Sequence, residues 1–286
     1  MTIRPAAVAG TWYPASPGAL AREVDGYVEA ASDGPRGAIG AIVVPHAGIM
    51  FSGPVGAHAY KAAARHDYDV AVLVGPSHFV AFDGVALYPE GAFACPFGPI
   101  AIDSAAAAAI GAAEVVRPMA SAHAREHSLE MQLPFLGRVL PGLPIVPLLM
   151  GQQSRRTIEQ LAQALADGLA SRRALLVAST DLSHYFDAVT AATLDGEVCA
   201  SVAAFSPEQL LDVFERYPAA ERGRHVGCGI GPAISVMLAA RALGARDARV
   251  LRYAHSGEVS GDFDGVVGYL AAVLGTFDAD GNLNAK

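Results

Sequence analysis

Short runs of apolar residues alternate along the chain with stretches in which apolar residues recur at helical spacing. The first such stretch follows Ser16-Pro17, a helix cap with proline at the first helical position, and it predicts a helix over residues 17–31. Similar patterns predict helices at 54–64, 104–112, 128–140, 154–170, 188–204 and 207–217, and one that begins just after Gly229. The intervening apolar runs are typical of buried strands and lie at 38–44, 69–74, 144–149 and 173–179.

Two late strands are predicted at residues 249–254 and 266–273. Their period-two apolar spacing and the Gly-rich loop 255–261 between them indicate an antiparallel pair. The alternation of strands and helices therefore predicts an α/β fold with a mixed sheet. Because no repeat, low-complexity linker or shift in composition marks a second domain, we expect residues 1–286 to form a single domain.

The composition favours a large core and argues against two classes of partner. Hydrophobic residues make up 52% of the chain and charged residues only 17%, unlike a disordered protein. The net charge of −8, without a run of basic residues, argues against nucleic acid or a membrane surface as a partner. No secretion signal is visible, and no apolar run approaches the roughly 20 residues that span a bilayer, so we expect a cytoplasmic protein.

Three cysteines, Cys95, Cys199 and Cys228, are scattered without a CxxC pair. This odd number argues against a disulfide framework and against a structural zinc knuckle. Cys199 lies in a helical Ala/Val pattern and is interpreted as a core residue, and Cys95 as a loop residue. Cys228 remains as the candidate for a thiol with a specific role.

Three predicted strands are followed by residues that carry chemistry. His46 follows the first, His78 follows the second, and Asp181 and His184 follow the strand that ends near residue 179. In open α/β sheets, ligands bind in the crevice beyond the carboxyl ends of the strands. These distant segments are therefore expected to converge on one edge of the sheet.

His46, His78 and Cys228 are the predicted ligands of one transition-metal ion, iron or copper. Imidazole is the commonest protein ligand for such ions, and two histidines with one anionic group leave coordination positions open. Cys228 stands between glycines ahead of a helical pattern, where a helix N-terminus favours the thiolate form. The alternative is two unrelated structural histidines and a small buried cysteine in a tight turn.

Asp181 and His184 are spaced to share one face of a helical turn, so they could orient one another, with His184 as a general acid or base. Alternatively, Asp181 only caps that turn. Glu126 and His127 begin an amphipathic stretch and are expected to support the ligands, as is Ser77 beside His78. Four other histidines do not follow a predicted strand and are interpreted as surface or structural residues: His58, His66, His123 and His225.

With these residues in view, the sequence resembles the MEMO family, whose prokaryotic members are often called AmmeMemoRadiSam system protein B. The resemblance covers almost the whole chain. It is carried, in order along the chain, by the segments Ala9–Pro14, Pro45–Gly48, Gly75–His78, Glu126–Met131, Ser179–His184 and Gly227–Gly229.

The resemblance implies a structural relationship to the class III extradiol ring-cleaving dioxygenases, with a mixed central sheet flanked by helices on both faces and a nonheme metal pocket. His46 and His78 match the two histidine ligands of those enzymes, and His184 matches their catalytic histidine. Cys228 stands where they use a carboxylate ligand. Because a thiolate favours softer ions, copper competes with Fe(II), and catechol cleavage is not implied.

Three functions follow as hypotheses. The leading one is an iron-dependent oxidoreductase in which Asp181, His184 and His127 handle protons around oxygen or a small substrate. The second is a non-catalytic adaptor that binds a peptide or small ligand in the pocket, since eukaryotic relatives are described as signalling adaptors. The third is a zinc hydrolase, because the same ligands suit zinc with an open water position. The family's association with a radical SAM protein implies a functional link to such a partner.

Overall fold

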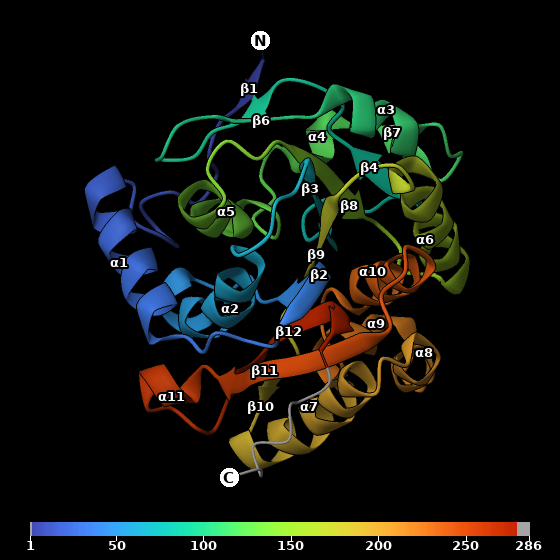
Figure 1. Cartoon of the computed structure of the whole chain (residues 1–286). Coiled ribbons are helices and arrows are strands. Elements are labelled where there is room, and N and C mark those ends of the chain that lie inside the picture. The colour runs from blue at the N-terminus through green and yellow to red at the C-terminus, as the bar shows by residue number, and fades with distance from the viewer. Residues whose placement is uncertain (1, 279–286) are drawn as a thin grey trace, which may run out of the picture.

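The computed structural model describes residues 2–278 and has a single α/β domain built on a mixed sheet, as predicted (Figure 1). Within these residues the main sheet has nine strands. Their spatial order is β10 (His184–Phe186), β12 (Val266–Phe277), β2 (Gly37–Val44), β9 (Ala174–Ser179), β3 (Val70–Pro76), β8 (Ile145–Met150), β4 (Val85–Leu87) and β7 (Val116–Pro118), with β11 (Asp247–His255) paired to β12. Residues 1 and 279–286 of the expected domain lie outside the described residues.

The centre of the sheet is parallel and its flanks are antiparallel. Strands β2, β9, β3 and β8 run parallel to one another, so their carboxyl ends meet at one edge. Strand β12 runs antiparallel to β2 and to β11, as predicted for the late pair, and β4 runs antiparallel to β8. All residues of β3 and β8 are buried, which explains their continuous apolar runs.

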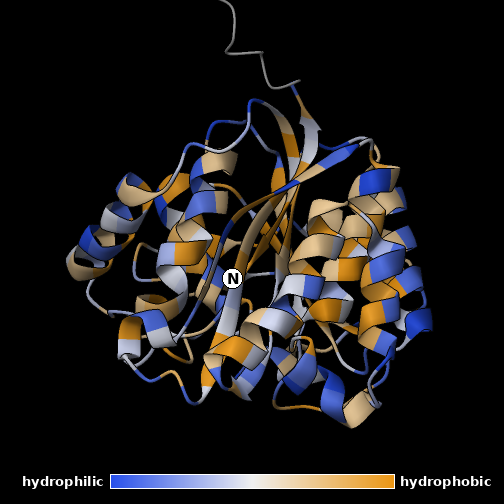
Figure 2. Cartoon of the chain, turned by 90° about the horizontal axis from the view of Figure 1, so that it is seen from below, coloured by the Kyte–Doolittle hydropathy of each residue, from blue (hydrophilic) through white to orange (hydrophobic). Residues whose placement is uncertain are grey.

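Helices cover both faces of the sheet (Figures 1 and 2). One group of contacting helices contains α1 (Pro17–Ala30), α2 (Ile49–Ala63) and α5 (Leu133–Val139). The other group contains α3 (Ser104–Gly111), α6 (Arg155–Leu169), α7 (Ala188–Ala203), α8 (Pro207–Glu215) and α10 (Ile230–Ala242). The shorter helices are α4 (Ala120–His123), the 3-10 turn Glu130–Gln132, α9 (Ala219–His225) and α11 (Gly257–Ser260).

Helix α6 illustrates why these segments fold as they do. Ser154 caps its N-terminus by accepting a hydrogen bond from the backbone of Thr157 at 3.2 Å. Its buried residues recur at helical spacing, among them Ile158, Leu161 and Leu165, and pack against α10 and α3. Among residues 2–278, no helix has the length and apolar character needed to span a membrane.

The segment near the N-terminus is tied to the body of the protein by a buried ion pair. It begins in a small sheet of β1 (Ile3–Arg4), β5 (Ala92–Phe93) and β6 (Ile100–Ala101). Arg4 pairs with Glu130, and their side chains are only 2% and 0% exposed. Glu130 also accepts hydrogen bonds from the backbone of Ala7 and Val8 and from the hydroxyl of Tyr13. These bonds fix the segment that carries Trp12.

Some boundaries differ from the predictions. The helix predicted at 54–64 begins at Ile49, and Pro54 lies inside α2, where it cannot donate a backbone hydrogen bond. The helix predicted at 128–140 is a 3-10 turn followed by α5. The predicted loop 255–261 contains the single turn α11. Strands β1, β4, β5, β6, β7 and β10 and the short helices α4 and α9 were not predicted, since such short elements cannot establish a periodic pattern.

Candidate metal centre

His46, His78 and Cys228 converge at the carboxyl edge of the parallel strands. His46 follows β2, His78 follows β3, and Cys228 precedes α10. One possible ligand atom from each residue lies within 4.8 Å of the other two. The Sγ atom of Cys228 is 3.2 Å from Nε2 of His46, and the His46 and His78 rings are 5.3 Å apart between centroids. His46 is buried and the His78 side chain is 28% exposed, so the cluster is accessible from the His78 side.

The end of β9 places the Cys228 loop against this cluster. Strand β9 lies between β2 and β3, and the N–H of Thr180 donates to the carbonyl of Val44 at 2.9 Å. The N–H of Gly229 donates to Oγ1 of Thr180 at 3.0 Å. A Cβ atom at Gly229 would lie 2.3 Å from the carbonyl oxygen of Ser179. Glycine is therefore required for the Cys228 loop to approach β9 so closely.

The two histidines are each held through Nδ1. Nδ1 of His46 is 2.8 Å from Oγ of Ser179, and Nδ1 of His78 is 2.9 Å from Oε1 of Glu126. Nε2 of each ring therefore remains available to coordinate a metal ion, which is the usual arrangement of metal-binding histidines. Two imidazole nitrogens and a sulfur atom in this arrangement fit iron, copper or zinc.

Glu126 supports His78 and the segment that follows it. Its carboxylate accepts hydrogen bonds from the backbone N–H groups of His78 at 2.6 Å and of His127 and Ser128 at 2.9 Å. Burial acts to raise the pKa of Glu126, but the hydrogen bonds and charge of His78 and the bond from Ser128 lower it to about 2. Glu126 is therefore ionised at neutral pH, as its expected supporting role requires.

Asp181 holds the backbone of His46 and does not orient His184. Oδ1 of Asp181 accepts the N–H of His46 at 2.7 Å. Burial raises the pKa of Asp181 to about 6, although the hydrogen bonds from His46 and Ala47 oppose the rise. Among residues 2–278, no hydrogen bond joins Asp181 to His184, so the predicted mutual orientation is wrong. The reason is that His184 begins the extended strand β10 instead of a helical turn.

His184 lies near the cluster. Burial lowers the pKa of His184, and the charge of His78 adds to the decrease. Within the part of the chain that the structure describes, the buried Nδ1 atom of His184 has no hydrogen-bond partner. Hydrogen bonding to the backbone of Leu182 and Gly223 acts to raise the pKa of His184 against this decrease, and the unpaired Nδ1 atom can accept a proton.

His127 stacks on His78 with ring centroids 4.5 Å apart and an interplanar angle of 19°. Burial, with the charge of His78, lowers the pKa of His127 to about 4, so this ring is neutral at neutral pH. The partly exposed rings of Trp12 and Phe79 lie 4.4 and 5.9 Å from it, between centroids. His127 thus stands between the predicted ligands and an aromatic rim.

Several expectations need correction or addition. The pKa of Cys228 is raised by burial and by the nearby Asp181 carboxylate, so the start of α10 does not by itself produce the predicted thiolate. A cation is needed to stabilise that form.

Oγ of Ser77 donates to the carbonyl of Val80 at 2.7 Å, so Ser77 shapes the loop after His78 instead of contacting a ligand. The roles of Ser179 and Trp12 are not apparent in the sequence, because neither residue type is a usual metal ligand.

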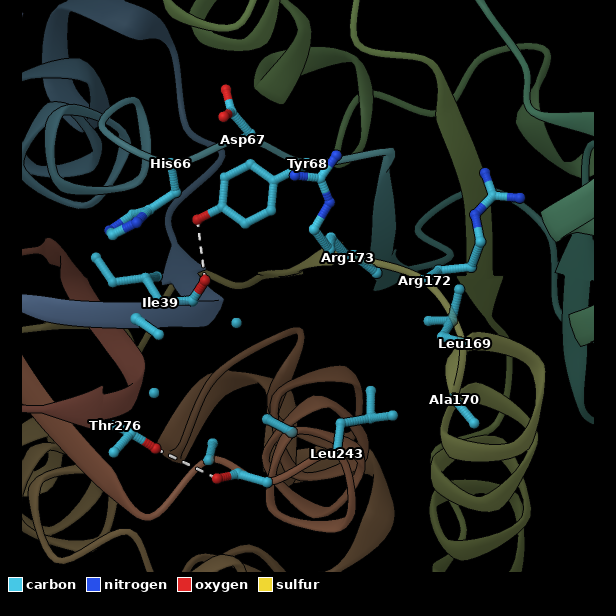
Figure 3. A pocket seen from close by; sticks show the side chains of 17 residues that line it. Ile39, His66, Asp67, Tyr68, Leu169, Ala170, Arg172, Arg173, Leu243 and Thr276 are labelled. Atoms are coloured by element: carbon cyan, nitrogen blue, oxygen red, sulfur yellow. Dashed lines mark hydrogen bonds between the residues drawn. The ribbon is translucent and has the colours of Figure 1, made fainter.

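A separate cavity of about 470 Å³, whose lining residues Figure 3 shows, lies at the end of the sheet opposite the His46, His78 and Cys228 cluster. It is lined by residues at or before the starts of β2, β3 and β9, including Ile39 and Tyr68. Its arginines are already paired, Arg172 with Asp103 and Arg173 with Asp69. Because ligands of parallel α/β sheets bind at the carboxyl ends of the strands, this cavity is the weaker candidate for a functional site.

Comparison with known proteins gives one family. The model of the Memo-like protein family matches residues 4–273. A MEMO1 family protein of Methanopyrus kandleri is 36% identical over 285 residues, covering 95% of this chain and 98% of that protein. A MEMO1 family protein of Methanosarcina mazei is also 36% identical, covering 96% and 100%. An uncharacterized protein of Escherichia coli K12 has a similar fold, with a TM-score of 0.55 and 12% identity, over 84% of this chain and 100% of its own.

Proposed function

The chain belongs to the Memo-like protein family, and on this basis we propose that it is an oxidoreductase that binds one iron ion through His46, His78 and Cys228. The observation that carries the proposal is the fixed orientation of both histidines. Each ring is held through Nδ1 by a residue that is not itself a ligand, so each Nε2 atom is available for a common ion.

Iron is proposed because the three donors leave room for redox chemistry at the ion, although the donor types alone do not distinguish it from copper or zinc. Three protein ligands leave coordination positions open for substrate or oxygen, and a thiolate increases the electron density on the ion. A bound iron ion supplies redox chemistry and a Lewis-acidic centre. Copper fits the same donors and is the first competitor.

The residues around the cluster would serve in proton transfer, in positioning His46 and in providing apolar surroundings. His127 is neutral at neutral pH and accepts protons beside His78. His184 offers a second ring nitrogen, and Asp181 keeps the His46 backbone in place. The rings of Trp12 and Phe79 flank His127 and provide apolar surface beside the cluster for a substrate.

Metal content after anaerobic purification tests this function. We expect near-stoichiometric iron or copper in the native protein and its loss in His46→Ala, His78→Ala and Cys228→Ser. Cys199→Ser and His58→Ala are matched controls, because both residues lie outside the cluster, and they are expected to retain the metal. A native protein that takes up none of Fe(II), Cu(I) or Zn(II) would overturn the proposal.

The chain has a single tryptophan, and this gives a direct measurement of binding. Trp12 lies 4.4 Å from His127, which in turn stacks on His78. We expect Co(II), a paramagnetic stand-in for iron, to quench Trp12 fluorescence and to saturate at a single equivalent, while diamagnetic Zn(II) quenches far less. In His78→Ala the Co(II) quenching is expected to disappear. Unchanged quenching in that variant would place the bound ion elsewhere.

A zinc hydrolase is the second candidate, because the same donors bind zinc and the neutral His127 could act as a base toward a bound water. Oxygen consumption in the presence of a reductant, lost in Cys228→Ser, supports the oxidoreductase. Hydrolysis of esters or amides by the zinc-loaded protein, without oxygen consumption, supports the hydrolase. A peptide partner that binds equally well after all three ligand substitutions would favour the adaptor alternative.

A further inference from the structure

Ser179 is fully buried at the end of β9 and its hydroxyl meets three partners. Its oxygen lies 2.8 Å from Nδ1 of His46, 2.7 Å from the carbonyl oxygen of Ser128 and 2.9 Å from Nε2 of Gln132. A serine hydroxyl has one proton to donate and two lone pairs that accept. Each partner can therefore be assigned a direction by counting protons.

The carbonyl oxygen of Ser128 can only accept, so it takes the single hydroxyl proton of Ser179. The orientation of the Gln132 amide is fixed as well, because its Nε2 donates to the carbonyl of Pro45 at 3.1 Å and its Oε1 accepts from the hydroxyl of Tyr60 at 2.9 Å. The other Nε2 proton of Gln132 goes to Oγ of Ser179 at 2.9 Å, because the alternative acceptor, the carbonyl oxygen of Ser128, lies farther away at 3.4 Å. Only an accepting lone pair of Ser179 remains for His46.

From this network we propose that Ser179 is a positioning residue that holds His46 in the tautomer protonated on Nδ1. In that tautomer the Nε2 lone pair of His46 faces Cys228 and is ready to bind an ion. The inference deepens the proposed metal function and rests on it for the identity of what Nε2 binds. The tautomer itself is a property of the protein without metal.

The two histidine ligands are thus held by different means. Glu126 is an ionised acceptor, so it fixes the tautomer of His78 and also increases the electron density of the ring. Ser179 is neutral, and its own lone pairs and proton are all engaged. Replacing Ser179 therefore changes which nitrogen of His46 carries the proton and leaves His78 unaffected.

Proton–nitrogen correlation spectra of the histidine rings in the metal-free protein test the proposal directly. We expect the native His46 ring to carry its proton on Nδ1, and Ser179→Ala to show a mixture of both tautomers or a shift to Nε2–H. Ser235→Ala is the matched control, since Ser235 is equally buried and its hydroxyl also donates to a backbone carbonyl, that of Ile158 at 2.9 Å. This control is expected to leave the His46 spectrum unchanged.

Co(II) affinity gives the second measurement. Loss of an outer partner of a metal-binding histidine typically weakens binding by about 10- to 100-fold, and we expect this for Ser179→Ala but not for Ser235→Ala. A native His46 protonated on Nε2, or a Ser179→Ala spectrum and affinity equal to native, overturns the proposal. If Ser179→Ala does not fold, the native spectrum alone decides.

The two proposals fail separately. A native protein that binds no Co(II), Fe(II) or Cu(I) contradicts the metal function, yet its ring spectra still report whether Ser179 fixes His46. A native protein that binds metal with His46 protonated on Nε2 beforehand contradicts the role of Ser179 only.

Discussion

Arg4 and Glu130 are separated by most of the first half of the chain, yet their side chains meet with almost no exposed surface. Arg4 also donates to the carbonyl groups of His123 and Glu126, so it joins the N-terminal segment to the loop that supports His78. A buried pair of this kind contributes little net stability over apolar residues, but removal of one partner leaves a charge without compensation.

We therefore predict that Glu130→Gln lowers the free energy of unfolding by about 3–5 kcal/mol, measured by urea denaturation. Glu197→Gln is the matched control, because Glu197 pairs with Arg216 on the surface, where the side chains are 44% and 52% exposed. That change is expected to cost no more than about 1 kcal/mol. Equal effects of the two substitutions would contradict the structural role of the buried pair.

The three candidate metal ligands could be predicted from the sequence, but the residues that hold them only in part. His46 and His78 follow apolar runs, and Cys228 precedes a helical pattern, so residue type and position were sufficient. The contact between Ser179 and His46 depends on the register of β9 against β2, in which Ser179 stands beside Val44. Hydrophobic patterns of separate strands do not contain that register, and a serine at a strand end is not distinctive.

At the scale of the element, the Cys228 loop depends on contact between backbones. Gly229→Ala would place a Cβ atom 2.3 Å from the carbonyl oxygen of Ser179, and a backbone atom cannot turn aside as a side chain can. We predict a loss of about 1–3 kcal/mol in the free energy of unfolding and weaker Co(II) quenching of Trp12, because the loop must move away from β9.

Gly26→Ala serves as the control for that substitution. Gly26 lies within α1, and no atom lies within 4 Å of the position that its Cβ would occupy. Alanine is expected to stabilise the protein by up to about 1 kcal/mol through helix propensity, with no change in Co(II) quenching. A neutral Gly229→Ala would show that the loop tolerates a side chain and that the close approach is not required.

The long helices and strands could be predicted from the sequence, whereas the short elements could not. Helices such as α6 and strands such as β8 repeat their burial pattern over many residues, so the sequence alone identifies them. Strand β10 spans only His184–Phe186 and forms because β12 is there to pair with it. Its extended backbone stands where a helical turn was expected to place Asp181 and His184 on one face.

At the scale of the whole molecule, buried histidines make stability depend on pH. Burial lowers the pKa of His123 from 6.5 to about 4, against a hydrogen bond to the carbonyl of Ala86 that acts to raise it. Between these pH values the unfolded chain binds a proton that the folded protein does not. The stabilisation that the neutral, buried His123 contributes is therefore complete above pH 6.5 and decreases as the pH falls toward 4.

We predict that the free energy of unfolding falls by up to about 3 kcal/mol over this range on account of His123 alone. His123→Phe, which keeps an aromatic ring beside Tyr88 and Phe93, is expected to flatten the slope whatever its effect at neutral pH. Urea denaturation at several pH values measures both slopes. Parallel slopes for the two proteins would contradict the prediction.

The position of β12 has a consequence for how the protein is made. This strand, formed by residues 266–277, pairs with β2, so it lies inside the sheet between the second strand of the chain and β10. While a ribosome is still synthesising the chain, one edge of β2 has no partner, and His46 follows an incomplete sheet. An open apolar edge is prone to aggregate. We therefore expect the nascent chain to need protection by a chaperone until β12 has emerged.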